Sequence, residues 1–171
     1  MPGARVHDLI TVSTLAAFDI LYMAKVHPAS LAPLCCFSGA YLFAGLACAG
    51  DLDTNSREYR RWGPLRFIWW PYRVLVPHRS WVSHGLIAGG IIRALYLGAM
   101  FFLLSWVGVW LWNRCGMHVD PASVTQLEAH SLGQIMRAHT QESLAFLAGF
   151  VLAGTTHSLA DIVSTGLKRW L

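Results

Sequence analysis

Four long apolar segments dominate the pattern of hydrophobic and polar positions along the chain. They cover residues 9–24, 31–50, 85–112 and 143–163. A helix rises about 1.5 Å per residue and the hydrocarbon core of a bilayer is about 30 Å thick, so a span needs about 20 apolar residues. The last three segments reach that length, whereas residues 9–24 are short and contain Asp19. The pattern predicts an all-α membrane bundle of about four apolar helices.

The third apolar segment is longer than one bilayer requires. Residues 94–112 contain no charged side chain, and these 19 residues would cover about 28 Å as a helix. This window is the predicted span. Arg93 would then lie at the membrane boundary, where a long cationic side chain can extend to water.

The connections between these segments differ in character. Residues 51–84 contain three prolines, four tryptophans and several arginines, a composition typical of short helices that lie on a membrane surface. Residues 113–142 are more polar, with a turn at 119–121 and a predicted helix from 122 onward. No composition shift marks a second domain, so residues 1–171 are expected to form one membrane-embedded helical domain.

The composition supports a membrane protein. Apolar residues make up 55% of the chain and charged residues 13%, against about 25% charged in soluble domains. The eight tryptophans fit a chain that meets membrane interfaces. Six arginines lie between Asp53 and His84, a run that suits nucleic acid or anionic lipid. Next to apolar spans, lipid is the preferred partner.

The distribution of lysine and arginine gives an expected orientation. With four spans, Arg5, the arginine-rich connection and the pair Lys168 and Arg169 fall on one side of the membrane. Short loops rich in Lys and Arg stay in the cytoplasm. The sequence therefore predicts a multi-pass protein of the inner (cytoplasmic) membrane, with both ends of the chain inside.

Histidines and aspartates from separated segments fall on this same predicted face. They are His7, Asp8, Asp51, Asp53, His78, His84, His157 and Asp161. His157 and Asp161 are four residues apart, which puts them on one face of a helix about 6 Å apart. Ionisable groups at membrane depth are costly and are usually paired or functional. The other reading is a His–Asp pair that only ties helices together.

The two histidines before the third segment cannot share one helical face. His78 and His84 are six residues apart, which corresponds to about 240° around a helix. If both bind a metal, His78 must precede the helix, and Pro77 makes that plausible. The predicted metal ligands are His7, Asp51, Asp53, His78, His84, His157 and Asp161. The four remaining histidines fall on the opposite face and are discounted: His27, His118, His130 and His139.

A His and Asp ligand set without cysteine suits Zn²⁺, with Mn²⁺ and Fe²⁺ as alternatives. Such sites most often activate water for hydrolysis. Asp53 or Asp8 is the predicted base, and Arg79 is predicted to bind an anionic or phosphate-bearing substrate. Two rivals stay open at this point. One is a metal-handling protein without catalysis, and the other is a structural membrane protein without metal.

These motifs resemble an uncharacterised bacterial family of metal-binding membrane proteins. The matching pieces are residues 3–8, 50–53, 61–62, 70–72, 78–85 and 154–161. Val6 departs from the pattern, in which a threonine is expected. A more distant similarity is to inner-membrane metal-dependent hydrolases, and a fainter one is to zinc-dependent phospholipase C. That last resemblance implies zinc held by His7, Asp51, His78 or His84, His157 and Asp161.

Overall fold

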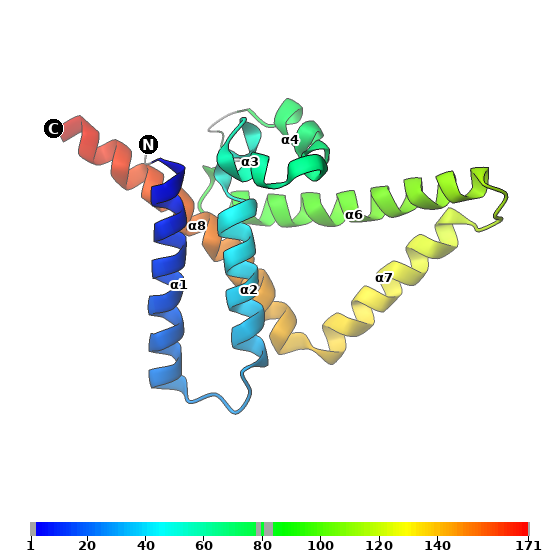
Figure 1. Cartoon of the computed structure of the whole chain (residues 1–171). Helices are drawn as coiled ribbons and strands as arrows, with labels where there is room; N and C mark the ends of the chain where they lie inside the picture. Colours follow the sequence, from blue (N-terminus) through cyan, green and yellow to red (C-terminus); the bar gives the residue numbers. More distant parts are fainter. Residues whose placement is uncertain (1–2, 78–79, 81–83, 171) are drawn as a thin grey trace.

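The computed structural model describes residues 3–77, 80 and 84–170 of the chain. Within these residues the fold is helical and contains no β-strand (Figure 1). The elements are α1 (Ala4–Val26), α2 (Ala32–Ala47), the 3-10 helix η1 (Gly50–Asp53), α3 (Arg57–Arg61), the 3-10 helix η2 (Gly63–Trp69), α4 (Trp70–Leu75), α6 (Ala88–Arg114), α7 (Pro121–Ala138) and α8 (Thr140–Trp170).

Helices α1, α2 and α8 form the packed part of the molecule. The most extensive helix–helix contact joins α2 and α8. Gly149 makes this approach possible, because a Cβ atom there would overlap the backbone of Phe37. Buried side chains from both helices, including Ala40, Ala44 and Ala153, fill the core. Small residues at the crossing let the two backbones come together, as is common where helices pack in lipid.

Polar side chains add links between the three packed helices. The Tyr41 hydroxyl of α2 lies 2.9 Å from the Thr14 hydroxyl of α1 and 2.7 Å from the Thr156 hydroxyl of α8. Further along, Ser38 of α2 donates to the Asp19 carboxylate of α1, with a shortest distance of 2.9 Å. Asp19 is thus a hydrogen-bond partner between helices, and α1 continues past it without a break.

Helices α6 and α7 form an arm that extends away from this packed part (Figure 1). Helix α6 runs crosswise to α1 and α2, and it packs on α8 near its start, where Gly90 meets the backbone of Val151. Along α7 no residue is buried, and a hydrogen bond from Ser105 to Glu128 joins it to α6. The arrangement therefore differs from a bundle in which all four apolar helices lie side by side.

Four helical stretches are long and apolar enough to cross a membrane. They are Arg5–Val26, Ala32–Asp53, Ala88–Arg114 and Thr140–Thr165, with mean hydropathies between 1.4 and 1.9. The predicted segments at 9–24, 31–50, 85–112 and 143–163 fall on these stretches. This result rests on length and composition. The first helical stretch is longer than the predicted segment 9–24 and is long enough to cross a membrane.

Three short helices form a cap at the end of α2. They are α3, η2 and α4, which match the short helices expected between the second and third segments, and they lie beside the start of α6 (Figure 1). Trp69 is buried in the cap, and the Trp62 indole donates to the Ala47 carbonyl of α2 at 2.7 Å. The cap is therefore fixed to the helix that leads into the candidate site.

Arg93 does not extend to water as the sequence suggested. Its side chain is only 1% exposed. It points inward because Gly154 of α8 leaves room for the guanidinium, which a Cβ atom at that position would overlap. Electrostatic interactions with Tyr72 and Asp53 accompany this burial. The expectation failed because hydropathy gives the depth of a residue but not the side of the helix that meets a neighbour.

Candidate metal centre

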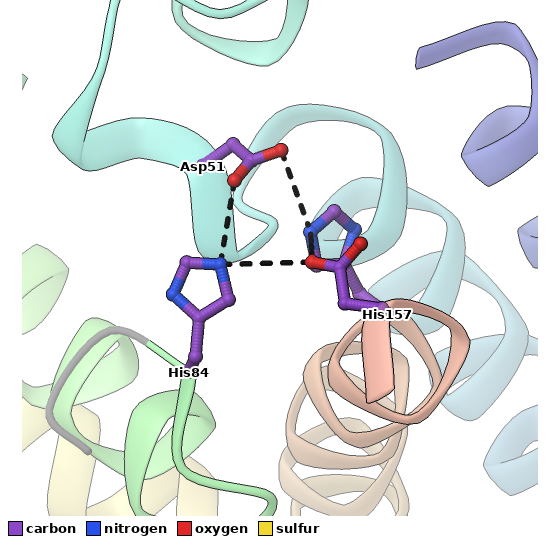
Figure 2. Close-up of side chains that lie close together, drawn as sticks. Asp51, His84 and His157 are labelled. Carbon is purple, nitrogen blue, oxygen red and sulfur yellow. Dashed lines mark ion pairs between the residues drawn. The ribbon is translucent and has the colours of Figure 1, made fainter. Parts of the chain in front are cut away.

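Two histidines and two aspartates come together where α2 ends and α6 begins. Asp51 lies on η1, His84 lies just before α6, and His157 and Asp161 are one turn apart on α8. One ligand atom from each residue lies within 4.8 Å of those of the other three. Figure 2 shows Asp51, His84 and His157 converging from three separate ribbons. The fold thus assembles the cluster from segments far apart in sequence.

Four of the separations between these atoms lie near those expected around one metal ion. The His84 Nε2 atom lies 3.3 Å from Asp51 Oδ1 and 3.7 Å from Asp161 Oδ2. The His157 Nε2 atom lies 3.7 Å from Asp51 Oδ2 and 3.7 Å from Asp161 Oδ2. A tetrahedral ion with bonds of about 2.0–2.1 Å separates its ligand atoms by about 3.3–3.5 Å. These four separations lie near that range, whereas the group as a whole spans up to 4.8 Å, so its members would have to draw together to bind one ion.

Several atoms of the cluster are buried without a hydrogen bond. Within the described residues, this is true of His157 Nε2 and of both carboxylate oxygens of Asp161. Leaving such a group unsatisfied costs about 1–3 kcal/mol, and more when it is charged. These nitrogen and oxygen atoms lie close together but are not aligned as donor and acceptor. Such an arrangement is expected when the atoms point at a shared cation.

The backbone at Gly50 lies against the cluster. A Cβ atom there would be 3.2 Å from a ring carbon of His157 and 3.3 Å from His84 Nε2. Both distances are tighter than ordinary van der Waals contact. Glycine therefore lets the turn carrying Asp51 close over the two imidazoles.

His7 lies against the same cluster from α1. Its ring stacks on the His157 ring, with the ring centroids 4.1 Å apart. Its Nε2 atom lies 3.1 Å from Asp161 Oδ1. His7 is 3% exposed. The sequence prediction that α1 contributes a histidine to this end of the molecule agrees with the geometry.

The other predicted aspartates have different surroundings. Asp53 is 8% exposed and interacts electrostatically with Arg93 and Tyr72, outside the group of four. Burial raises the pKa of Tyr72, and the positive charge of Arg93 partly opposes this shift. Asp8 faces the cap, where Arg61 donates to it and Arg57 lies 3.4 Å away. The hydrogen bond to Asp8 raises the pKa of Arg61. Asp8 therefore joins α1 to α3.

The structure thus brings together His7, Asp51, His84, His157 and Asp161 and places Asp8 and Asp53 beside them. His78 and Arg79 lie outside the described residues. The four discounted histidines, His27, His118, His130 and His139, are all exposed. That the clustered residues act as metal ligands, and that Asp53 or Asp8 acts as a base, stays a prediction.

Sequence reasoning missed two buried charged residues at this end of the molecule. Glu58 of α3 is 2% exposed, and Arg93 of α6 is 1% exposed. Glu58 lies among arginines in the connection that was predicted to lie on the membrane surface. The spacing of Ser56 and Tyr59 shows the start of α3, since the Ser56 hydroxyl accepts from the Tyr59 amide. No signal in the sequence showed which side of this short helix is buried.

Comparison with known proteins points to metal binding. A protein of Aquifex aeolicus (strain VF5), described as an uncharacterized protein, is 26% identical over 136 residues, which cover 78% of this chain and 93% of the relative. No solved structure matches the chain significantly. A family model described as "Uncharacterized metal-binding protein (DUF2227)" matches residues 2–171. The chain belongs to this family of metal-binding proteins.

Proposed function

We propose that the protein is a membrane-embedded, metal-dependent hydrolase whose ion is held by Asp51, His84, His157 and Asp161. One observation carries the metal site: nitrogen and oxygen atoms of these residues approach one another to 3.3–3.7 Å, and within the described residues the buried His157 Nε2 atom and both Asp161 carboxylate oxygens have no hydrogen bond. The family description gives independent support for metal binding.

The chemistry of the donor set limits which metal ions are suitable. The cluster offers two imidazoles and two carboxylates, and none of the free cysteines belongs to it. Imidazole with carboxylate suits Zn²⁺, Mn²⁺ and Fe²⁺, whereas Ca²⁺ and Mg²⁺ prefer oxygen ligands alone. Zinc is the proposed ion, with manganese and iron as the alternatives that the same ligands accept.

The uneven exposure of the cluster supports catalysis over a closed structural site. The side chains of Asp51 and His84 are 22% and 13% exposed, whereas that of His157 is 2% exposed. Ligands from α8 therefore form the floor of the centre, and those from η1 and the start of α6 form its open side. A bound ion would supply Lewis-acid chemistry and make water a better nucleophile near neutral pH. Asp53, which is buried on the same 3-10 helix as Asp51, is the proposed base.

Exposed residues of the cap support the proposal of an anionic substrate such as a phosphoester or lipid headgroup. Arg60 and Arg66 are exposed on it, and Leu65, Phe67 and Trp70 are exposed on the same short segment, between 52% and 63%. Arginine beside exposed aromatic and aliphatic side chains suits the headgroup region of a membrane. Asp8 is less suited to act as a base, because Arg57 and Arg61 stabilise its charged form.

The four long apolar helices support the proposal of a multi-pass membrane protein. In this proposal α1 and α2 cross the bilayer side by side, and the arginine-rich cap lies on the cytoplasmic face with the metal centre. The site would then lie where a headgroup in the inner leaflet can reach it.

The decisive experiment is metal analysis of the purified full chain in detergent. We expect the wild-type protein to retain bound metal after dialysis, and we expect His157→Ala and Asp51→Ala to lose it. The matched control is His130→Ala, which removes an exposed histidine from α7. Equal metal contents in all four proteins would reject the site.

A second measurement tests hydrolysis separately. We expect hydrolysis of a soluble phosphoester probe or of short-chain phospholipids, and we expect chelation to abolish it and the added metal to restore it. Metal that binds at the predicted residues without hydrolysis of either probe class would instead favour the non-catalytic metal-handling function.

A further inference from the structure

His7 presents two unused ring nitrogens to the interior of the protein. The residue is 3% exposed, and within the described residues neither Nδ1 nor Nε2 has a hydrogen bond. Its Nε2 atom lies 3.1 Å from Asp161 Oδ1, yet the pair does not have hydrogen-bond geometry. Two ligands of one ion point at the ion rather than at each other, and about 3 Å is an ordinary separation for them. The pair therefore has the arrangement of two metal ligands.

The carboxylate of Asp161 faces two sets of partners. Its Oδ2 atom lies 3.7 Å from the Nε2 atoms of both His84 and His157, inside the group of four. Its Oδ1 atom faces His7, which is not a member of that group. A carboxylate with one oxygen toward each of two sites is suited to bridge two ions, which in hydrolytic pairs lie about 3.5–4 Å apart.

The electrostatics of this end of the molecule favour more than one cation. Glu58 is 2% exposed and acts electrostatically on His7 and on Arg61. Buried charges are normally paired or coordinate metals. Asp51, Asp161 and Glu58 together carry one more negative charge than a single divalent ion can neutralise.

We propose that the centre holds two divalent cations, with Asp161 bridging them, His7 binding the second ion and the buried Glu58 carboxylate balancing its charge. This inference rests on the proposed function, because the first ion is the one held by Asp51, His84, His157 and Asp161. It adds a residue, Glu58, that the sequence did not place in the site. It also gives His7 a role distinct from that of the other histidines.

The alternative role for His7 is to hold Asp161 in position by a hydrogen bond. That role would leave a single ion in the wild-type protein. Loss of His7 would then lower the affinity for that ion without changing the number of sites. The number of ions per chain therefore distinguishes the two roles, and the measurement does not depend on any enzymatic activity.

The test uses the full chain in detergent, stripped by a chelator and then titrated with Mn²⁺. We expect two ions per chain for the wild type, one for His7→Ala and a second ion bound at least tenfold more weakly for Glu58→Gln. His130→Ala is the matched histidine control and should keep two. Far-ultraviolet circular dichroism should show unchanged helix content in each variant.

Electron paramagnetic resonance of the Mn²⁺-loaded wild type gives a second measurement that needs no variant. Two ions bridged by one carboxylate should give a spin-coupled spectrum, and His7→Ala should give the spectrum of an isolated ion. One uncoupled ion in the wild type, with the same number in His7→Ala, would overturn the second site and leave the first intact. No bound ion in the wild type would overturn both.

Discussion

The packed end of the molecule and the α6–α7 arm both contain long apolar helices, but these helices are held in different ways. At the packed end, Gly149 lets α8 meet α2, and the Tyr41 hydroxyl joins three helices. Along the arm, Leu95, Phe101 and Trp112 are each more than half exposed, and α7 buries no residue. The chemistry-bearing residues belong to the packed end.

This difference shows that hydropathy and packing carry separate information. Helix α6 has the highest mean hydropathy of the four candidate spans, 1.9, and yet its most apolar window has no buried residue. Helix α8 is less apolar at 1.4 and carries both His157 and Asp161. In a membrane protein, lipid can cover an apolar face, whereas precise side-chain geometry requires protein on several sides.

The largest expected effect follows from changing Gly50 at the packed end. Gly50→Val would push methyl groups between the rings of His84 and His157, since a Cβ atom alone would already lie 3.2 Å from the His157 ring. We expect metal affinity to fall about 10–100-fold, comparable to the loss of a supporting residue in other metal sites. Calorimetric titration with Zn²⁺ measures this. Gly39→Val is the control, because nothing lies within 4 Å of a Cβ atom there.

An intermediate effect should separate the stabilities of the two regions. Gly149→Ala would force α8 away from the Phe37 backbone, and we expect a loss of about 1–3 kcal/mol in the free energy of unfolding. Gly98→Ala in α6 meets nothing within 4 Å and should raise stability by about 0.5–1 kcal/mol through helix propensity. Unfolding in detergent measures the change in the free energy of unfolding for each of the two variants. Equal shifts in the same direction would contradict the distinction between the packed end and the arm.

The smallest expected effect lies in the arm and depends on pH. The Asp120 carboxylate accepts hydrogen bonds from the Ser123 hydroxyl and from the Ser123 and Ala122 amides, which lowers its pKa. A group with a lowered folded-state pKa stabilises the fold above its unfolded value, so this helix cap is lost as the pH falls through the lowered pKa. The protection of the amides at the start of α7, measured relative to the intrinsic exchange rate at each pH, should fall below about pH 4, while α2 amides stay protected. Asp120→Ala should remove the pH dependence.

The sequence predicted the elements of the fold better than their arrangement. The positions of α1, α2, α6 and α8 follow from apolar length, and the helical character of 122–142 is largely met by α7. The crosswise direction of α6 could not be predicted, because it depends on which small residues meet, as at Gly90 and Val151. Hydropathy averages over a whole helix and carries no such information.

For the candidate site, the sequence predicted which residue types would gather. His157 and Asp161 share a helical face by their spacing, and the orientation predicted from lysine and arginine put Asp51 and His84 on the same expected face. The inward direction of Arg93 and the burial of Glu58 were missed, because both depend on the cap folding back over α2 and α6. Such contacts between distant segments leave no local pattern in the chain.

The Tyr41 hydroxyl also helps to fix the rotation of α8 about its own axis. It contacts Thr156, the residue directly before His157. A rotation of α8 by one residue would turn its side chains by about 100° and carry the His157 ring away from Asp51. This hydrogen bond therefore helps to fix the orientation of the candidate ligands on α8, although it involves none of them.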